Sequence, residues 1–499
     1  MILPALPILL PLFTIILLLA VFRRRALQPW IGFASSTFQL ILSLWLAVLV
    51  KKEGILVLHT GNWLAPFGIT LVIDSFSSFM LVLSGIISFS IGIYSIPAID
   101  KQRQSFFFYP MMHALLMGVN GAFVTGDVFN MYVWFEVMLM SSFVLISLGG
   151  EKKQLNGAVK YVTLNLVSSM FFLAGIGLLY GKTGTLNMAD LAVKLADGGN
   201  SILINTSAVL LFVAFSIKAA VFPFFFWLPA SYHTPPITIT ALFAGLLTKV
   251  GVYAMIRFYT LFFVQDQLFW HPLFLWIGGF TMVVGVLTAA SQFDIRRILS
   301  FHIISQIGYM IMGLGIFTVA GIAGAIFYMA HNIIAKTNTF LVAGLINRVT
   351  GSYDLKSIGG LYKNYPFLAV LFIIPAFGLA GIPPLSGFFG KLILISAGFE
   401  AGKYFISFVA LGVGLFTLFS MVKIWNEAFW KESPAIADNQ PHHKNKMPLG
   451  MVIPVVFLGL ITLFMGFAVK PILDFAMSAS AQLLNPTEYI NAVLSKRIP

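Results

Sequence analysis

The sequence contains no cysteine, and only 9% of its 499 residues are charged. The absence of cysteine excludes disulfide bonds, thiolate metal sites and cysteine-ligated iron–sulfur clusters in this chain. Soluble domains carry about 25% charged residues, so the low charge content excludes a soluble globular protein. Hydrophobic residues make up 59% of the chain instead.

Several motifs of common enzymes are also missing. The sequence has neither the G-x-G-x-x-G nor the G-x-x-x-x-G-K-[ST] phosphate loop, and it has no nucleophile elbow. No two histidines have the H-x-x-x-H spacing of a helical metal site. We therefore expect no cofactor, and the sequence leaves the position of any metal ion open.

Apolar runs recur along the whole chain, and their length of about 20 residues is what a helix needs to cross a bilayer. We predict an all-α, polytopic membrane protein with about fourteen transmembrane helices. The predicted spans lie near 3–22, 30–50, 71–95, 107–125, 128–148, 157–180, 204–230, 237–260, 272–290, 295–317, 320–347, 366–399, 404–428 and 449–470. The tail 471–499 is mildly amphipathic and is predicted to form an interfacial helix.

The distribution of basic residues predicts the orientation in the membrane. Loops that follow odd-numbered spans hold fifteen Lys and Arg residues, including Arg23 to Arg25, and the other loops hold five. Because basic loops stay in the cytoplasm, both termini are predicted to lie on the outer side of the cytoplasmic (inner) membrane. Orientation also explains the net charge of +13 better than nucleic-acid binding does. The first apolar segment lacks a basic n-region, which favours a retained helix over a signal peptide.

An internal repeat is visible at a shift of 167 residues. This shift aligns Gly118, Val119, Ala122, Asp127, Ala158, Tyr161 and Asn165 with Gly285, Val286, Ala289, Asp294, Ala325, Tyr328 and Asn332. It spans five predicted helices, and an odd number inverts the second copy, as in many transporters. We predict a three-helix segment at 1–105, a first five-helix repeat at 106–262, a second, inverted five-helix repeat at 263–430, and a loop, last span and tail at 431–499.

Each repeat contains one helix that proline interrupts. The stretch "AFSIKAAVFPFFFWLPASYHTPP" holds Pro223, and "FGLAGIPPLSGFFGKLIL" holds Pro383 and Pro384. Proline removes a backbone hydrogen bond and so breaks a helix. A lysine lies near each break, Lys218 in the first and Lys391 in the second. We expect the carbonyl groups freed at the first break to provide polar partners for Lys218 inside the membrane.

Five ionisable residues lie deep within predicted spans: Glu136, Lys218, Lys249, Lys336 and Lys391. A charge at such a depth costs about 2.5 to 3.5 kcal/mol on insertion scales and usually marks a transport pathway. Burial weakens the hold of a lysine on its proton, and an approaching carboxylate restores it, whereas arginine stays protonated. A Glu/Lys pair is therefore suited to a proton relay.

Other interpretations of these residues remain open. Lys423 lies near a helix end, and we expect it to snorkel to the membrane surface. Glu136 could form an ion pair that is only structural. His302, His331 and His233 are further candidates for the relay, and each could also be an ordinary core histidine. His442 and His443 are interpreted as loop histidines.

At these residues the sequence resembles a known family, the antiporter-like membrane subunits shared by respiratory complex I, membrane-bound hydrogenases and Mrp-type Na+/H+ antiporters. The resemblance rests on the Glu136 span and on "IKAAVFPFFFWLPASYHTPP", "LFAGLLTKVGVYAMIR" and "AGIPPLSGFFGKL". It covers essentially the whole chain. Within the family, the D-type branch of the Mrp antiporters is the most similar.

The resemblance implies a function. It implies an inward proton half-channel at Glu136, Lys218 and Lys249. A lateral line would then run through Lys336, His331 and His302 to an exit half-channel at Lys391. The implied partners are other membrane subunits, including a large A subunit and a small C-type subunit, with H+ and Na+ or K+ as the transported ions. Two alternatives stay open: a proton-pumping subunit of complex I or a hydrogenase, and a structural scaffold subunit.

Overall fold

The computed structural model of the chain describes residues 2–197, 201–432 and 446–495. Within these residues, 12 helices are long and apolar enough to cross a membrane. They are α1 (Leu6–Ala20, extended at its start by the 3-10 turn η1, Leu3–Ala5), α2 (Gln28–Glu53), α3 (Ser75–Ala98), α6 (Val128–Ser147), α7 (Lys152–Thr183), α9 (Ile202–Ala219), α11 (Ile237–Leu261), α12 (Gln267–Ser291), α13 (Ile295–Ile316), α14 (Val319–Thr350), α18 (Tyr404–Trp425) and α19 (Leu449–Phe467). The predicted class of an all-α polytopic membrane protein is confirmed.

Shorter apolar helices account for the remaining predicted spans. The fourth predicted span corresponds to α5 (Phe108–Val124), and the twelfth to the pair α16 (Pro366–Ala380) and α17 (Ser386–Glu400). Each of the fourteen predicted spans thus contains an apolar helix, while the number that crosses the bilayer stays a prediction. His442 and His443 lie outside the described residues.

Short elements connect the long helices. They are β1 (Leu56–His59), η2 (Thr60–Asn62), β2 (Thr70–Ile73), α4 (Lys101–Ser105), α8 (Met188–Asp197), α10 (Trp227–Ser231), α15 (Leu361–Asn364), η3 (Asn426–Trp430), α20 (Val469–Leu484) and α21 (Thr487–Leu494). The two strands pair antiparallel, with Leu56 opposite Ile73. The predicted start of the third span at residue 71 is wrong, because Asp74 accepts a hydrogen bond of 2.8 Å from the Ser77 amide and begins α3 after β2.

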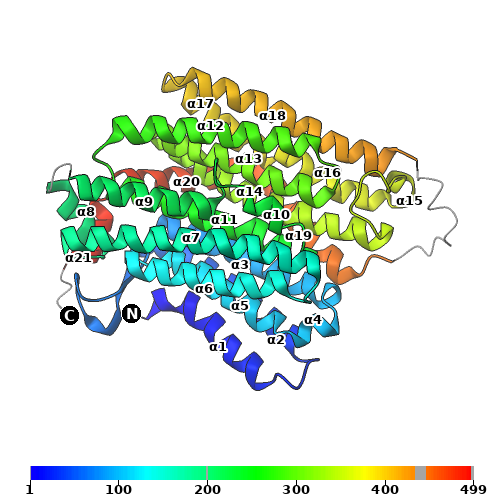
Figure 1. The fold of residues 1–499 in the computed structure, drawn as a ribbon, viewed down its shortest axis with the longest axis horizontal. Coiled ribbons are helices and arrows are strands. Elements are labelled where there is room, and N and C mark those ends of the chain that lie inside the picture. The colour runs from blue at the N-terminus through cyan, green and yellow to red at the C-terminus, as the bar shows by residue number, and fades with distance from the viewer. Residues whose placement is uncertain (1, 198–200, 433–445, 496–499) are drawn as a thin grey trace.

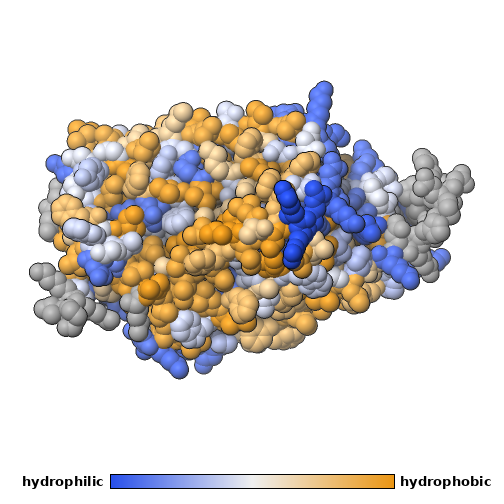
Figure 2. All heavy atoms as spheres, turned by 90° about the horizontal axis from the view of Figure 1, so that it is seen from below, coloured by the Kyte–Doolittle hydropathy of each residue, from blue (hydrophilic) through white to orange (hydrophobic). Residues whose placement is uncertain are grey.

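The long helices lie side by side along the longest axis of the molecule (Figure 1). The two chain ends lie at one end of this bundle together with α8 and α21, whereas α4 and α15 lie at the other end. This arrangement agrees with an even number of spans. Figure 2 shows a mostly hydrophobic surface across the middle of the bundle, with hydrophilic residues gathered toward its ends, as a bilayer requires.

The C-terminal tail is part of the bundle. Helix α20 packs against α3 and α14, and the Ser480 hydroxyl donates a 2.8 Å hydrogen bond to the Val319 carbonyl at the start of α14. The tail predicted as one interfacial helix forms two helices, and the first of them buries Ala476 and Ala479. Its position at the membrane interface stays a prediction.

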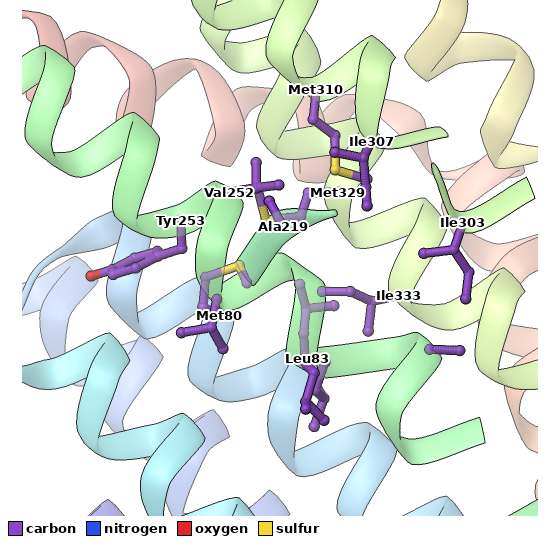
Figure 3. Close-up of a cluster of buried hydrophobic side chains, with 14 of the residues drawn as sticks. Met80, Leu83, Ala219, Val252, Tyr253, Ile303, Ile307, Met310, Met329 and Ile333 are labelled. Atoms are coloured by element: carbon purple, nitrogen blue, oxygen red, sulfur yellow. The ribbon is translucent and has the colours of Figure 1, made fainter. Parts of the chain in front are cut away.

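Three helices form the centre of the molecule. In α11, α13 and α14, 89% or more of the most apolar stretch is buried inside the protein. Figure 3 shows the side chains that fill the space between them, including Met80 from α3, Val252 from α11, Ile307 from α13 and Met329 from α14. A polar side chain on these three helices is therefore mostly buried inside the protein and does not face lipid.

The shift of 167 residues reappears in the structure. Helices α7 and α14 each have 32 residues, and their bounds differ by 167 at both ends. Each is followed by a glycine in the left-handed conformation, Gly184 and Gly351. Helix α8 follows α7 at one end of the bundle and α15 lies at the other end, so α7 and α14 run in opposite directions (Figure 1). These features agree with an inverted repeat, and the domain boundaries stay a prediction.

The two helix breaks share one backbone pattern. The Val221 amide donates to the carbonyl of Ser216 at 3.0 Å, and the Ile382 amide donates to that of Phe377 at 3.1 Å. The residue after each first half is left-handed, with φ of 57° at Ala220 and 89° at Gly381. The two breaks are 161 residues apart in the sequence. Lys218 lies before the first break and Lys391 lies after the second, so the two lysines do not occupy equivalent positions.

Candidate functional site

The predicted site residues lie on a continuous series of helices. In this series each helix packs on the next, in the order α6, α7, α9, α11, α14 and α17. These helices carry, in turn, Glu136, Ser169, Lys218, Lys249, Lys336 and Lys391. His302 lies on α13, which packs against α14. The series therefore runs from helix to helix across the bundle, from α6 to α17.

Glu136 and Lys218 meet through a serine. The Ser169 hydroxyl donates a short hydrogen bond to the Glu136 carboxylate. The Lys218 ammonium donates to the same Ser169 oxygen and to the Asn165 carbonyl, both at 3.5 Å. No ion pair joins Glu136 to Lys218 among the described residues. The predicted Glu/Lys pair is therefore indirect, with Ser169 between the two charges.

A small cavity lies beside Lys218. It is lined by Phe135, Tyr161, Asn165 and Trp227, among others, and the centres of water-sized spheres can occupy about 20 Å³ of it. One water molecule needs about 10 to 15 Å³ on this measure. The cavity therefore has room for one water next to the ammonium group.

The partners of Lys218 differ from the predicted ones. The carbonyl and the hydroxyl that accept its hydrogen bonds belong to α7 and not to the break, where the Ile217 carbonyl accepts a 2.9 Å hydrogen bond from the Trp227 indole instead. The expected arrangement occurs at the second break. There the Lys391 ammonium donates to the Leu379 and Ala380 carbonyls, both at 2.9 Å, at the interrupted end of α16.

The two central lysines have few partners. Lys249 donates to the Ala244 carbonyl of its own helix at 2.6 Å. Lys336 is fully buried, and its ammonium group has no hydrogen-bond partner among the residues that the structure describes. Lys249 and Lys391 lie on α11 and α17, and both of these helices pack against the helix that carries Lys336. The four lysines thus form a spaced line without a carboxylate between them.

The histidines occupy different places. Both ring nitrogens of His302 lack a hydrogen-bond partner within the described chain. His331 shares a 2.8 Å hydrogen bond between its Nδ1 atom and the hydroxyl of Ser386, the first residue of the helix that carries Lys391. His302 on α13 and His331 on α14 lie on helices that pack against each other and against α17, which carries Lys391. The lateral line through these two histidines stays a prediction.

His233 lies apart from the buried lysines. Its Nδ1 atom shares a 2.7 Å hydrogen bond with the Pro229 carbonyl, and its ring is half-buried in the wall of a large cavity at the end of the bundle. Burial lowers the pKa of the His233 imidazole, and the positive charges of Arg297 and Arg296 lower it further. The structure does not bring His233 into contact with Lys218.

Sequence reasoning missed the residues that connect Glu136 to Lys218. Asn165 and Ser169 are four residues apart on α7, and the 167-residue shift places them on Asn332 and Lys336. Ser169 therefore occupies the position in the first repeat that Lys336 occupies in the second. This correspondence could have identified Ser169 as a candidate site residue.

A buried ion pair was also missed. Arg257 on α11 lies 2.6 Å from Asp74, and their side chains are 6% and 2% exposed. The guanidinium group also lies over the rings of Phe76, Tyr253 and Tyr489. This pair ties the helix that carries Lys249 to α3 and to the C-terminal α21. Arg257 lies in the quoted stretch "LFAGLLTKVGVYAMIR", but nothing in its spacing pointed to Asp74.

Lys423 is half-buried near the end of α18. Its ammonium group donates to the Ala290 and Gln292 carbonyls at 3.0 and 2.8 Å and thereby caps the end of α12. The predicted snorkelling to the membrane surface stays a prediction. Within the described residues, no three His, Cys, Asp or Glu side chains come together as a metal site would require.

The chain is similar in sequence to known membrane proteins. Residues 125–420 match the family described as "NADH:quinone oxidoreductase/Mrp antiporter, TM". The D-type Na(+)/H(+) antiporter subunit of Alkalihalophilus pseudofirmus is 48% identical over 98% of this chain and 99% of its own length. The D-type Na(+)/H(+) antiporter subunit of Bacillus subtilis is 41% identical over 98% and 99%.

Two solved structures are similar over almost the whole chain. A chain of the Mrp complex from Dietzia sp. DQ12-45-1b superposes with a TM-score of 0.91 at 31% identity, covering 99% of both chains. A chain of the membrane-bound sulfane sulfur reductase, an archaeal respiratory membrane complex, gives the same TM-score of 0.91 at 24% identity, covering 98% of this chain and 99% of its own. The second match establishes a shared fold only.

Proposed function

The chain belongs to the membrane-subunit family of NADH:quinone oxidoreductases and Mrp antiporters, and we propose that it is the D-type, proton-translocating subunit of a multisubunit Na+/H+ antiporter. Relatives named as D-type antiporter subunits match it end to end at 48% and 41% identity. The likeness to the respiratory complex, at 24% identity, carries no such argument. The antiporter is therefore favoured over a redox-driven pump.

One observation carries the proposed mechanism. The lysines Lys218, Lys249, Lys336 and Lys391 are buried on helices that pack one on the next, and none forms an ion pair within the described residues. A scaffold would pair such charges, because an uncompensated buried charge costs several kcal/mol. The buried pair that does hold helices together is Arg257 with Asp74. The unpaired lysines therefore support a relay.

The proposed route has three parts. Glu136, Ser169, Lys218 and Lys249 form the inward half-channel, in which movement of the Glu136 charge loads or unloads the Lys218 amine. Lys336, with His302 and His331, forms the lateral line, and water fills the gaps beside its unpartnered groups. Lys391 forms the exit half-channel in the second repeat. His233 serves the cytoplasmic mouth.

The proposal extends to the surroundings of the protein. The two repeats, 106–262 and 263–430, act as the two half-channels between the three-helix segment 1–105 and the final part 431–499. The chain lies in the cytoplasmic membrane with both termini outside, beside other membrane subunits that include a large A subunit and a small C-type subunit. Proton entry drives Na+ or K+ out of the cell, and a proton moved across 100 mV supplies about 2.3 kcal/mol.

Everted membrane vesicles test this function. Glu136→Ala and Lys218→Ala should each abolish Na+-dependent alkalinisation while the complex still assembles, whereas Lys423→Ala should retain transport because Lys423 lies outside the route. Normal transport by either assembled relay variant would reject the mechanism. Co-purification with flavin or iron–sulfur subunits would reject the antiporter in favour of the redox pump.

A further inference from the structure

A large polar cavity lies at the end of the bundle that carries α4 and α15. It has a volume of about 1030 Å³ and lies between the start of α7, the short helix α10 and the turn from α12 to α13. Its wall contains Lys153, Lys160 and Arg297, whose side chains are exposed. His233 is the one predicted relay residue in the wall, and the buried lysines contribute nothing to it.

The wall of the cavity contains cationic side chains that are not paired with a carboxylate. Two of its three carboxylates are paired with a cation, Glu151 with Arg103 at 2.8 Å and Asp294 with Arg296 at 3.6 Å. The third, Asp354, accepts a 3.1 Å hydrogen bond from the Lys356 amide and keeps its charge. In contrast, Lys153, Lys160 and Arg297 form no ion pair in the part of the chain that the structure describes. The cavity therefore favours an anion.

Aromatic side chains adjoin these cations. Phe225, Phe226 and Phe301 line the same cavity, and Phe226 is 55% exposed where the broken helix opens to the outside. On α7, Val159 is 61% exposed next to Lys160, so this flank of the cavity faces the hydrocarbon. A ligand that fills the site must therefore be anionic at one end and apolar at the other.

We propose that this cavity binds the headgroup of an anionic phospholipid from the cytoplasmic leaflet. The phosphate lies among Lys153, Lys160 and Arg297, and an acyl chain runs out over Phe226 and Val159. Basic pockets between spans on the cytoplasmic side are suited to such headgroups. A free phosphate would satisfy the three cations equally well, but it would leave the exposed Phe226 without a partner. The lipid therefore fits the wall better.

Lipid retention by the intact complex tests the site. The complex is exchanged into phosphatidylcholine, incubated with vesicles of phosphatidylcholine and phosphatidylglycerol, and re-purified, and native mass spectrometry counts the phosphatidylglycerol that remains. We expect the triple variant K153Q/K160Q/R297Q to retain one anionic lipid fewer than the wild type. Each single substitution should weaken retention about five-fold. Phe226→Ser should also weaken it while leaving the charges in place.

Lys152→Gln is the matched control, because Lys152 neighbours Lys153 on α7 but does not line the cavity. It should retain lipid like the wild type. Equal retention by the triple variant and the wild type would overturn the proposal. Displacement of the lipid by inorganic phosphate at equal concentration would also overturn it, because that result identifies a site for the free anion. Neither result depends on transport activity.

Discussion

The two broken helices have nearly the same backbone and different chemistry. At the first break, Lys218 is held by a carbonyl and a hydroxyl of α7, and the hydroxyl also binds Glu136. At the second, Lys391 is held by two carbonyls of the interrupted helix itself. A carboxylate can move and change its charge, whereas backbone carbonyls are fixed dipoles. The first site is therefore suited to switching and the second to holding.

The largest effect is expected where the holding site loses its amine. Lys391→Ala should lower Na+-driven proton transport about 100-fold or more, the usual loss when a proton-transfer group is removed. Lys391→Arg should fail as well, because arginine keeps the hydrogen bonds but does not release its proton. Fluorescence quenching in everted vesicles measures both. Wild-type transport by the arginine variant would mean that Lys391 acts only as a fixed charge.

A smaller effect is expected at the switching site. Glu136→Gln keeps the shape and the hydrogen bond of the side chain but removes the charge that acts on Lys218. Transport should fall about ten-fold. Glu427→Gln is the matched control. Glu427 pairs with Lys431 at the end of the bundle, and neither residue lies on a helix that carries one of the four buried lysines. An equal loss in both variants would argue against a special role for Glu136.

The connection between the two charges can be weakened separately. Ser169→Ala removes the hydroxyl that joins Glu136 to Lys218, and transport should fall about five-fold, as for one lost hydrogen bond. Ser386→Ala removes the partner of His331 at the second break and should cost no more than that. A larger loss at Ser386 than at Ser169 would reverse the assignment of switching and holding sites.

The smallest effect concerns Asp127 and Asp294, whose carboxylates accept hydrogen bonds from backbone amides in the first turns of α6 and α13. Burial raises the pKa of Asp127 to about 6. The folded chain then binds more protons than the unfolded chain between about pH 4 and pH 6, so folded stability falls as pH rises through that window. Asp127→Asn still caps the helix and should abolish this fall. Asp294→Asn, in the more exposed cap of the second half, should change it little; thermal unfolding of the purified complex at several pH values compares them.

The sequence predicted the architecture well because proline, glycine and apolar length leave strong marks. Pro223 and Pro384 located both breaks, and the 167-residue shift related the predicted spans 157–180 and 320–347, which the structure shows as two helices of equal length, α7 and α14. The depth of Lys249 and Lys336 followed from the number of apolar residues around them. Both are fully buried in the structure.

Partners across the bundle could not be predicted, because they depend on how helices pack. Ser169 is an ordinary small residue in the sequence, and only its place between α6 and α9 makes it a bridge. Arg257 meets Asp74 across 183 positions of the chain, and no local pattern encodes that contact. The hydrogen-bond partners of Lys423 could not be predicted for the same reason, since the carbonyls that it caps belong to another helix.

Lys336 gives the most direct test, because it stands between the two proposed half-channels and has no hydrogen-bond partner among the described residues. The measurement is Na+-gradient-driven proton flux in proteoliposomes that contain the purified complex. Lys336→Ala should assemble with the other subunits and lose this flux. An assembled Lys336→Ala complex that carries protons at the wild-type rate would contradict the account, because protons would then have a route that avoids the lysine line.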